Sequence, residues 1–406
     1  MKTPLGTMFS TNITPSRRFG IGEYSEADFS RAVRKGIRKD GSNLYPAMPY
    51  TAYSYMTDQD VHELYVYFMN SVQPVENAPP RTSLPFPMNI RSSMMFWNML
   101  FRNDRSFQPD PERSAVWNRG AYLAQGAAHC GTCHTPRGFL MQEKPSEDLG
   151  GASLGSWYAP NITSDKISGI GNWSHENIKT YLKSGHIDGV AQAAGGMGEA
   201  VEHSFQHLTD ADLNALATYL ETTKPVRDPK DGNISRFALG KPISSADLVR
   251  GDQPIRSGDN PNISGAELFM GNCASCHNYR AQGSHDGYYP SLWYNSVTGA
   301  SSPDNLIATI LFGVERRSSG TEAFMPGFGG KKTDAFQLSD SEIAKLSQYV
   351  VDTYGRKKVS VSPSQVALIR QGGPKSPLLV LSRIGMAAGA IVIALGVCWI
   401  LRKFRK

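Results

Sequence analysis

Two short motifs constrain this chain of 406 residues more than any other feature. Each has two cysteines separated by two residues and followed directly by a histidine. They are Cys130-Gly131-Thr132-Cys133-His134 and Cys273-Ala274-Ser275-Cys276-His277. C-x-x-C-H is the pattern at which c-type haem is attached. Two thiols add across the haem vinyl groups, and the adjacent histidine reaches the iron as its proximal ligand. The motifs therefore predict two covalently bound haems.

Cysteine pairs of this kind also occur in zinc sites and in thioredoxin-like redox proteins. A shared zinc ion would have to join two motifs that are separated by the 140 residues from Cys133 to Cys273. A thioredoxin-like site would need a βαβ pattern, and none surrounds either pair. Both alternatives are weaker than haem attachment, and the fifth cysteine, Cys398, lies in an apolar run where we expect it to be inert.

The chain contains an internal repeat with an offset of 149 residues. It relates Asn12-Ile13-Thr14 to Asn161-Ile162-Thr163, Gly20-Ile21-Gly22 to Gly169-Ile170-Gly171, and Met48 to Met197. A third, looser copy contains Met325. Each copy ends alike, with a Met in a Gly- or Pro-containing loop followed by a helix. The N-caps of these helices are Thr57, Thr209 and Ser339, each with an acidic residue three positions later. Repeats of this length are tandem domains, and the predicted structure is helices and loops.

The repeated methionines are candidate iron ligands, because Met is the usual sixth ligand in cytochromes c. Met197 follows His134 by 63 residues, and Met325 follows His277 by 48. We therefore predict His134 with Met197 on one iron and His277 with Met325 on the other.

Two alternatives stay open for these methionines. A single Met usually packs in a core, and His203 or His207 could replace Met197 as a ligand. Met48 occupies the equivalent position in the first copy, and we predict it as a ligand there.

The sequence also offers partners for the histidines and the haem edge. Pro160 follows His134 by 26 residues and Pro290 follows His277 by 13, and we expect their carbonyls to bind the second ring nitrogens. Simple turn formation is the alternative for both prolines. Arg137 could bind a haem propionate, although a solvated surface role is equally ordinary.

The sequence of the C-terminus predicts a membrane anchor. Residues 378–401 are apolar apart from Ser382 and Arg383, long enough for a spanning helix, and residues 402–406 are mostly basic. The positive-inside rule then places the tail in the cytoplasm and the preceding domains on the opposite side. A buried core helix is the alternative.

The net charge of +6 belongs to this end of the chain. Seven basic and no acidic residues follow position 369, which leaves 35 basic and 36 acidic residues before it. A nucleic-acid-binding surface would show a broad basic excess, so we expect no nucleic-acid partner.

These observations predict a mainly α fold of tandem cytochrome c-like domains, the first one truncated, with a C-terminal transmembrane helix. The predicted divisions are a truncated domain at 1–80, a Pro-rich linker at 81–112, cytochrome c domains at 113–230 and 263–355, linkers at 231–262 and 356–377, an anchor at 378–401 and a basic tail at 402–406.

Several stretches resemble one known family. They are CHTPRGF, NITSDKISGIGNWS, AVEHSFQHLTDADLNALATYL, DGYYPSLWYN and PDNLIATILFGV. The chain is similar, over nearly its whole length, to the triple-haem cytochrome c subunits of membrane-bound dehydrogenases from acetic acid and related bacteria. The last two stretches look closest to the gluconate 2-dehydrogenase type.

The resemblance implies haem c as cofactor and electron transfer from a catalytic subunit to ubiquinone. The expected partners are a flavoprotein dehydrogenase that oxidises gluconate or a related sugar or sugar acid, a small accessory subunit, ubiquinone and the membrane. The expected location is the cell membrane, with the haem domains in the periplasm. A quinoprotein alcohol dehydrogenase complex is the alternative, and a dihaem peroxidase is a weaker one. Substrate oxidation is expected in another subunit.

The start of the chain departs from this family pattern. Family members have three C-x-x-C-H motifs and an export signal, whereas this chain has two motifs and begins MKTPLGTMFS. The repeat offset places the missing histidine upstream of Met1. We therefore expect that the reading frame begins further upstream and that the full-length protein has three haems, with Met48 on the first iron. A degenerate first domain kept for docking is the alternative.

Overall fold

The computed structural model describes residues 2–3, 5–102, 104, 106–240, 263–330, 337–356 and 358–404. Most of the expected linker 231–262 and the last two residues of the basic tail lie outside this range. The described chain separates into two compact units. Unit 1 comprises residues 1–107, 138–142 and 374–406, and unit 2 comprises residues 108–137 and 143–373.

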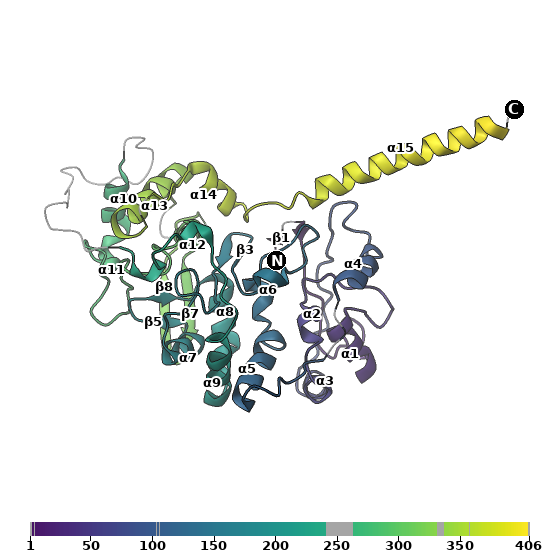
Figure 1. The fold of residues 1–406 in the computed structure, drawn as a ribbon, viewed down its shortest axis with the longest axis horizontal. Helices are drawn as coiled ribbons and strands as arrows, with labels where there is room; N and C mark the ends of the chain where they lie inside the picture. Colours follow the sequence, from purple (N-terminus) through teal and green to yellow (C-terminus); the bar gives the residue numbers. More distant parts are fainter. Residues whose placement is uncertain are drawn as a thin grey trace. The chain divides into compact units, whose positions relative to one another are not determined.

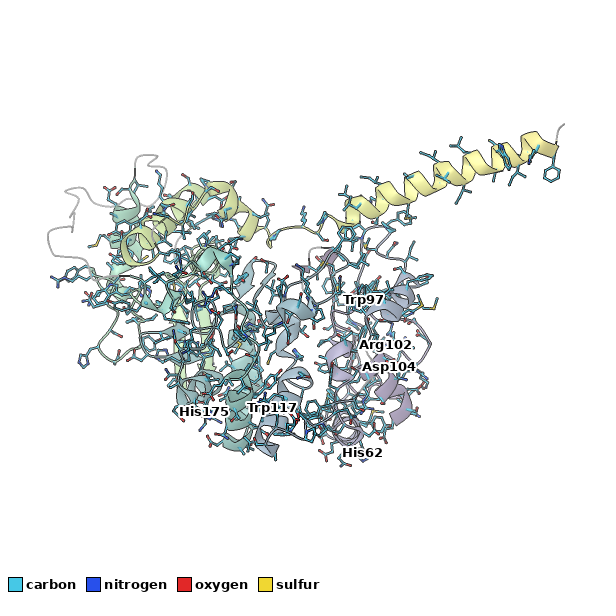
Figure 2. The ribbon with its side chains drawn as sticks, in the orientation of Figure 1. His62, Trp97, Arg102, Asp104, Trp117 and His175 are labelled. Carbon is cyan, nitrogen blue, oxygen red and sulfur yellow. The ribbon has the colours of Figure 1, made fainter. Side chains whose placement is uncertain are left out.

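Unit 1 contains the first repeat and the C-terminal helix (Figure 1). Its elements are β1 (Lys2–Thr3), β2 (Gly6–Thr7), α1 (Glu26–Lys35), α2 (Tyr50–Tyr53), α3 (Asp58–Asn70), α4 (Ser93–Phe101) and α15 (Leu378–Phe404). One small hydrophobic cluster in its core has the buried residues Ile21, Phe29, Met56 and Val61. Trp97 of α4 packs edge-on against Tyr50 (Figure 2).

The outer face of α4 remains exposed. Met95, Phe96, Met99 and Leu100 are between 59% and 74% accessible. The inner face packs through Asn98, whose side-chain oxygen accepts a 2.7 Å hydrogen bond from the Tyr50 hydroxyl.

The helix α15 is long and apolar enough to cross a membrane over Leu378–Leu401, with a mean hydropathy of 2.4. None of that apolar window is buried in the described structure, which favours a membrane span over a core helix. Among the described residues it is the one helix that meets these criteria.

Unit 2 contains the two modules with the cysteine motifs. The first has α5 (Ala115–Gln125), α6 (Cys130–His134), η1 (Pro145–Glu147), β3 (Ala152–Leu154), β4 (Trp157–Ala159), α7 (His175–Ser184), β5 (His186–Ile187), β6 (Ala191–Gln192), α8 (Gly195–His203), η2 (Phe205–His207), α9 (Asp210–Leu220), η3 (Pro229–Asp231) and η4 (Arg236–Ala238). The second has α10 (Gly265–Asn272), α11 (Ala274–His277), α12 (Asp304–Phe312), β7 (Val314–Ser318), β8 (Thr321–Met325), α13 (Asp340–Tyr354) and α14 (Pro363–Arg370).

Each module packs its opening helix against its closing helix. In the first, Trp117 of α5 meets Tyr219 of α9 with ring centroids 5.3 Å apart. In the second, Phe269 of α10 packs on Tyr354 of α13 at 5.2 Å. Both modules therefore share the same pairing of an opening and a closing helix.

The predicted helix starts are confirmed. The side chains of Thr57, Thr209 and Ser339 accept hydrogen bonds from the backbone three residues later, at the N-termini of α3, α9 and α13. Such caps satisfy backbone N–H groups that have no partner within the helix.

Two loops predicted from the sequence have regular structure instead. Met197 lies in the first turn of α8, and Met325 ends the strand β8, which pairs with β7 in a hairpin. Both elements are too short to give a clear periodic pattern in the sequence.

Candidate haem sites

The first motif forms a single short helix. Cys130, Cys133 and His134 all lie in α6, and the backbone N–H of Thr135 closes its last turn on the carbonyl of Gly131 at 2.9 Å. Residues three apart lie on one face of a helix. The local backbone therefore presents both thiols together and places the histidine one residue further along.

The ring of His134 is oriented by the backbone, as predicted. Its Nδ1 donates a 2.6 Å hydrogen bond to the carbonyl of Pro160. The carbonyl of His134 itself accepts from the N–H of Gly151 at 2.6 Å. Because Nδ1 is occupied, Nε2 is the nitrogen that can bind a metal.

A turn at Asn161 holds the Pro160 carbonyl in place. The side-chain oxygen of Asn161 accepts from the N–H and the hydroxyl of Thr163 at 2.8 and 2.7 Å. Its side-chain nitrogen donates to the carbonyl of Val226 at 2.6 Å, which ties the turn to the segment after α9.

Unit 1 builds the same turn at the equivalent position of the first repeat. The side-chain oxygen of Asn12 accepts from the N–H and hydroxyl of Thr14 at 2.9 and 2.7 Å, and its nitrogen donates to the carbonyl of Val75 at 2.8 Å. The repeat therefore preserves hydrogen bonding as well as residue types. Met48 of this unit lies in the bend before α2, where its carbonyl accepts from the N–H of Tyr50.

The second motif repeats the arrangement of the first. Cys273 caps α11, which ends at His277. The Nδ1 of His277 donates to the carbonyl of Pro290 at 3.0 Å, as predicted, and the His277 carbonyl accepts from Gly283 at 2.9 Å. Both histidines are thus held for ligation through Nε2.

Burial sets the protonation of these groups. It lowers the pKa of the His134 and His277 imidazoles, which keeps them neutral, as metal ligation requires. It raises the pKa of the Cys130 and Cys273 thiols to about 12. Since zinc binds thiolates, this environment disfavours a zinc site. No group of three or more potential His, Cys, Asp or Glu ligands occurs among the described residues.

Glycines fix the backbone beside both candidate methionines. Gly195, two residues before Met197, has a φ of +52°, and a Cβ there would lie 2.7 Å from the ring of Trp157. Gly313 has a φ of +73°, and a Cβ there would lie 2.4 Å from the carbonyl oxygen of Met325. These positions require glycine, because a side chain would displace the segment that carries the methionine.

The two alternative histidine ligands are exposed. His203 ends α8 and His207 lies in η2, both open to solvent. This exposure disfavours them as ligands of an iron held against the half-buried His134.

Arg137 is engaged elsewhere, so it does not fit the role of propionate ligand. Its guanidinium donates to the carbonyl of Thr132 and pairs with Glu143 at 3.3 Å. Buried donors without an acceptor occur instead at Arg236 Nε, Trp173 Nε1 and Arg280 Nε. Buried donors are nearly always satisfied, and a cofactor with two carboxylates supplies acceptors of the right kind. The residues present therefore fit haem c.

Comparison with known proteins agrees with this chemistry. The cytochrome c family profile matches residues 118–224 and 263–353. The chain is 42% identical to the fructose dehydrogenase cytochrome subunit of Gluconobacter japonicus, covering 100% of this chain and 85% of that protein. It is 38% identical to the cytochrome c subunit of alcohol dehydrogenase (quinone) of Gluconacetobacter polyoxogenes, over 92% of this chain and 78% of that protein.

A third relative is the gluconate 2-dehydrogenase cytochrome c subunit of Pantoea cypripedii, which is 36% identical over 91% of this chain and 82% of that protein. Its identity is below that of the fructose dehydrogenase subunit, so these values do not single out the gluconate type. The chain belongs to the cytochrome c family, among the haem c-containing cytochrome subunits of membrane-bound dehydrogenases.

Proposed function

We propose that this chain carries electrons from a flavin-containing dehydrogenase subunit, which oxidises a sugar or sugar acid, to ubiquinone. Domains 113–230 and 263–355 lie on the periplasmic side, and residues 378–401 anchor them in the membrane. A small accessory subunit completes the complex. The catalytic subunit holds the substrate, and this chain supplies the route for the electrons.

Haem c, when bound, supplies one-electron redox chemistry at its iron. In this proposal Cys130 and Cys133 hold one haem, and Cys273 and Cys276 hold the other. His134 and His277 are the proximal ligands, and Met197 and Met325 occupy the sixth positions. Met48 has the corresponding role in the first domain.

The observation that carries the proposal is the matched pair of histidine–carbonyl bonds, 2.6 Å at His134 and 3.0 Å at His277. A fixed ring orientation suits a site that changes charge without changing geometry, because little reorganisation then accompanies each electron. A methionine beside a conformationally required glycine in each module supports six-coordinate irons. A peroxidase would instead need an open sixth position on one iron.

The relatives support two partner classes. Fructose and gluconate dehydrogenase subunits favour a sugar or sugar-acid substrate, and 42% identity to the former is the highest among those described above. The 38% identity to the alcohol dehydrogenase (quinone) subunit keeps a quinoprotein partner as the second candidate.

Purification of the complex from its native membranes tests both the substrate class and the type of catalytic partner. The substrate that reduces the haem α-bands identifies the catalytic activity, and the prosthetic group of the co-purifying subunit separates flavin from quinoprotein partners. We expect a ubiquinone analogue to reoxidise the haems. Substrate-reduced haems that stay reduced with ubiquinone would contradict the electron route, and rapid turnover of hydrogen peroxide would favour a peroxidase.

A further inference from the structure

Arg236 is a buried cation with an incomplete set of partners. It lies in η4 and is 8% exposed. Its Nη2 donates to the carbonyl of Asn161 at 3.0 Å, whereas its Nε is buried without an acceptor. A buried charge is costly unless it is paired and hydrogen-bonded. The side chain therefore requires a further acceptor.

The surrounding described residues do not supply the missing negative charge. Asp231 is the nearby carboxylate, and it lies 3.8 Å from Arg356. Arg356 also donates to the carbonyls of Gly299 and Asp231 at 2.9 and 3.1 Å. Among the described residues, Asp231 is thus the carboxylate that acts on Arg236, and it is already paired with Arg356.

A second donor without an acceptor lies in the same cluster. The Nε1 of Trp173 is buried and has no partner. Its ring packs against Tyr181 and Phe237, with centroids 5.3 and 5.5 Å apart. The guanidinium carbon of Arg236 lies 5.1 Å from the same Phe237 ring. Trp173 and Arg236 therefore both lie against the ring of Phe237.

This cluster adjoins the proximal histidine of the first motif. Arg236 binds the carbonyl of Asn161, and His134 binds the carbonyl of the preceding residue, Pro160. A haem attached at Cys130 and Cys133 would supply two carboxylates as acceptors. We infer that Arg236 and Trp173 bind a propionate carboxylate of that haem. The inference rests on haem attachment at the first motif and is independent of the proposed route of the electrons.

Arg236 acts on the redox potential of the haem through its charge. The guanidinium neutralises the propionate, and a carboxylate without it would stabilise the oxidised iron, which carries one more positive charge. Neutral substitution of Arg236 should therefore lower the midpoint potential of this haem. A low dielectric at a buried site strengthens the effect.

The test uses the full-length protein in detergent, with haem content checked by the pyridine haemochrome spectrum. Arg236→Gln removes the charge, Arg236→Lys keeps it, and Trp173→Phe removes one donor while keeping the ring. Arg317→Gln is the control, because that side chain is 69% exposed. Each variant is measured by redox titration and by the propionate-bending band in resonance Raman spectra.

For Arg236→Gln we expect the ratio of reduced to oxidised haem at fixed potential to fall about tenfold for one haem, which corresponds to about 59 mV. The affected haem is the one whose midpoint also moves in Met197→Ala. Arg236→Lys should leave the midpoint potential close to that of the unmodified protein. Trp173→Phe should shift the propionate-bending Raman band, and Arg317→Gln should change neither the midpoint nor the band.

An Arg236→Gln protein with both haems, unchanged midpoints and an unchanged propionate band would overturn the inference. Where Arg236→Gln fails to fold or to retain haem, Trp173→Phe decides, because it keeps an aromatic ring against Tyr181 and Phe237. An unaltered propionate band in that variant would equally overturn it.

Discussion

At the residue scale, the arrangement around each C-x-x-C-H histidine leaves one ring nitrogen for a metal. The sixth ligand then sets much of the iron's electronic character, since Met ligation raises the potential of a histidine-ligated haem. Met197 and Met325 are placed by different elements, a helix and a strand, beside glycines that tolerate positive φ. Their roles can be tested separately.

Replacing Met197 or Met325 with Ala should lower the midpoint potential of one haem by about 59 mV or more, a tenfold change in its redox ratio. The haem should stay attached, because the cysteines are untouched. Redox titration with pyridine haemochrome analysis measures both effects. Met99→Ala is the control, since that side chain is 74% exposed. Unchanged midpoints in both variants would refute the ligand assignment.

His175, labelled in Figure 2, is expected to make a pH-dependent contribution to stability. Its Nδ1 lies 3.1 Å from Glu221 Oε2, and its Nε2 lies 2.9 Å from Asn214 Oδ1. The hydrogen bond to Glu221 raises the pKa of His175 above its usual value of 6.5. Because the folded pKa exceeds the unfolded one, the contribution is complete below pH about 6.5 and is lost as pH rises through the folded pKa.

His175→Gln should therefore reduce the free energy of unfolding more at pH about 5.5 than at pH about 8. Denaturant unfolding at the two pH values measures the difference. Glu221→Gln, which removes the carboxylate partner of His175, should show the same pH dependence. A loss of equal size at both pH values would show that the ion pair does not contribute in this way.

At the element scale, the β7–β8 hairpin connects the two modules of unit 2. Arg316 of β7 is 2% exposed and donates to the carbonyl of Ala193 and to Gln192 Oε1 at 2.7 and 2.9 Å. The hydroxyl of Ser318 donates to the carbonyl of Ser184 at 2.5 Å. The hairpin that ends at Met325 therefore also supports the chain just before α8, which carries Met197.

Arg316→Leu should destabilise unit 2 by about 3 kcal/mol, because it leaves two acceptors of the first module without their donors. Thermal and denaturant unfolding measure this loss. The matched control is Arg317→Leu, one residue along the same strand and 69% exposed, which should change stability by less than about 0.5 kcal/mol. Equal stability of the two variants would show that Arg316 does not join the modules.

At the scale of the whole molecule, α15 and the basic residues after it stand apart in composition from the haem-binding modules. No part of the apolar window in Leu378–Leu401 is buried in the described structure, so the stretch suits a lipid environment. The proposed electron transfer to a membrane quinone would require the haems to stay close to the bilayer, and a membrane anchor would serve that purpose.

Deletion of residues 378–406 should release the protein from membranes in soluble form with its haems attached. Membrane fractionation and the haem spectrum check this, and quinone reduction by the complex should fall. The full-length chain expressed in parallel is the control. Truncated protein that still sediments with membranes in the absence of its partner subunits would disprove the anchor.

The sequence by itself determined the features that depend on neighbours along the chain. The haem motifs, the caps at Thr209 and Ser339 and the apolar run of α15 follow from residue types at fixed short spacings. The carbonyls of Pro160 and Pro290 could also be predicted, because a proline follows each motif histidine along the chain, by 26 residues at His134 and by 13 at His277.

Only the tertiary structure decided the partners of the buried charges. Arg236 reaches Asn161 across 75 residues, and Arg316 reaches Ala193 across 123. No short spacing encodes such contacts, since they arise when packing excludes water and leaves a charged side chain with whatever acceptors the folded chain and its cofactor bring to it.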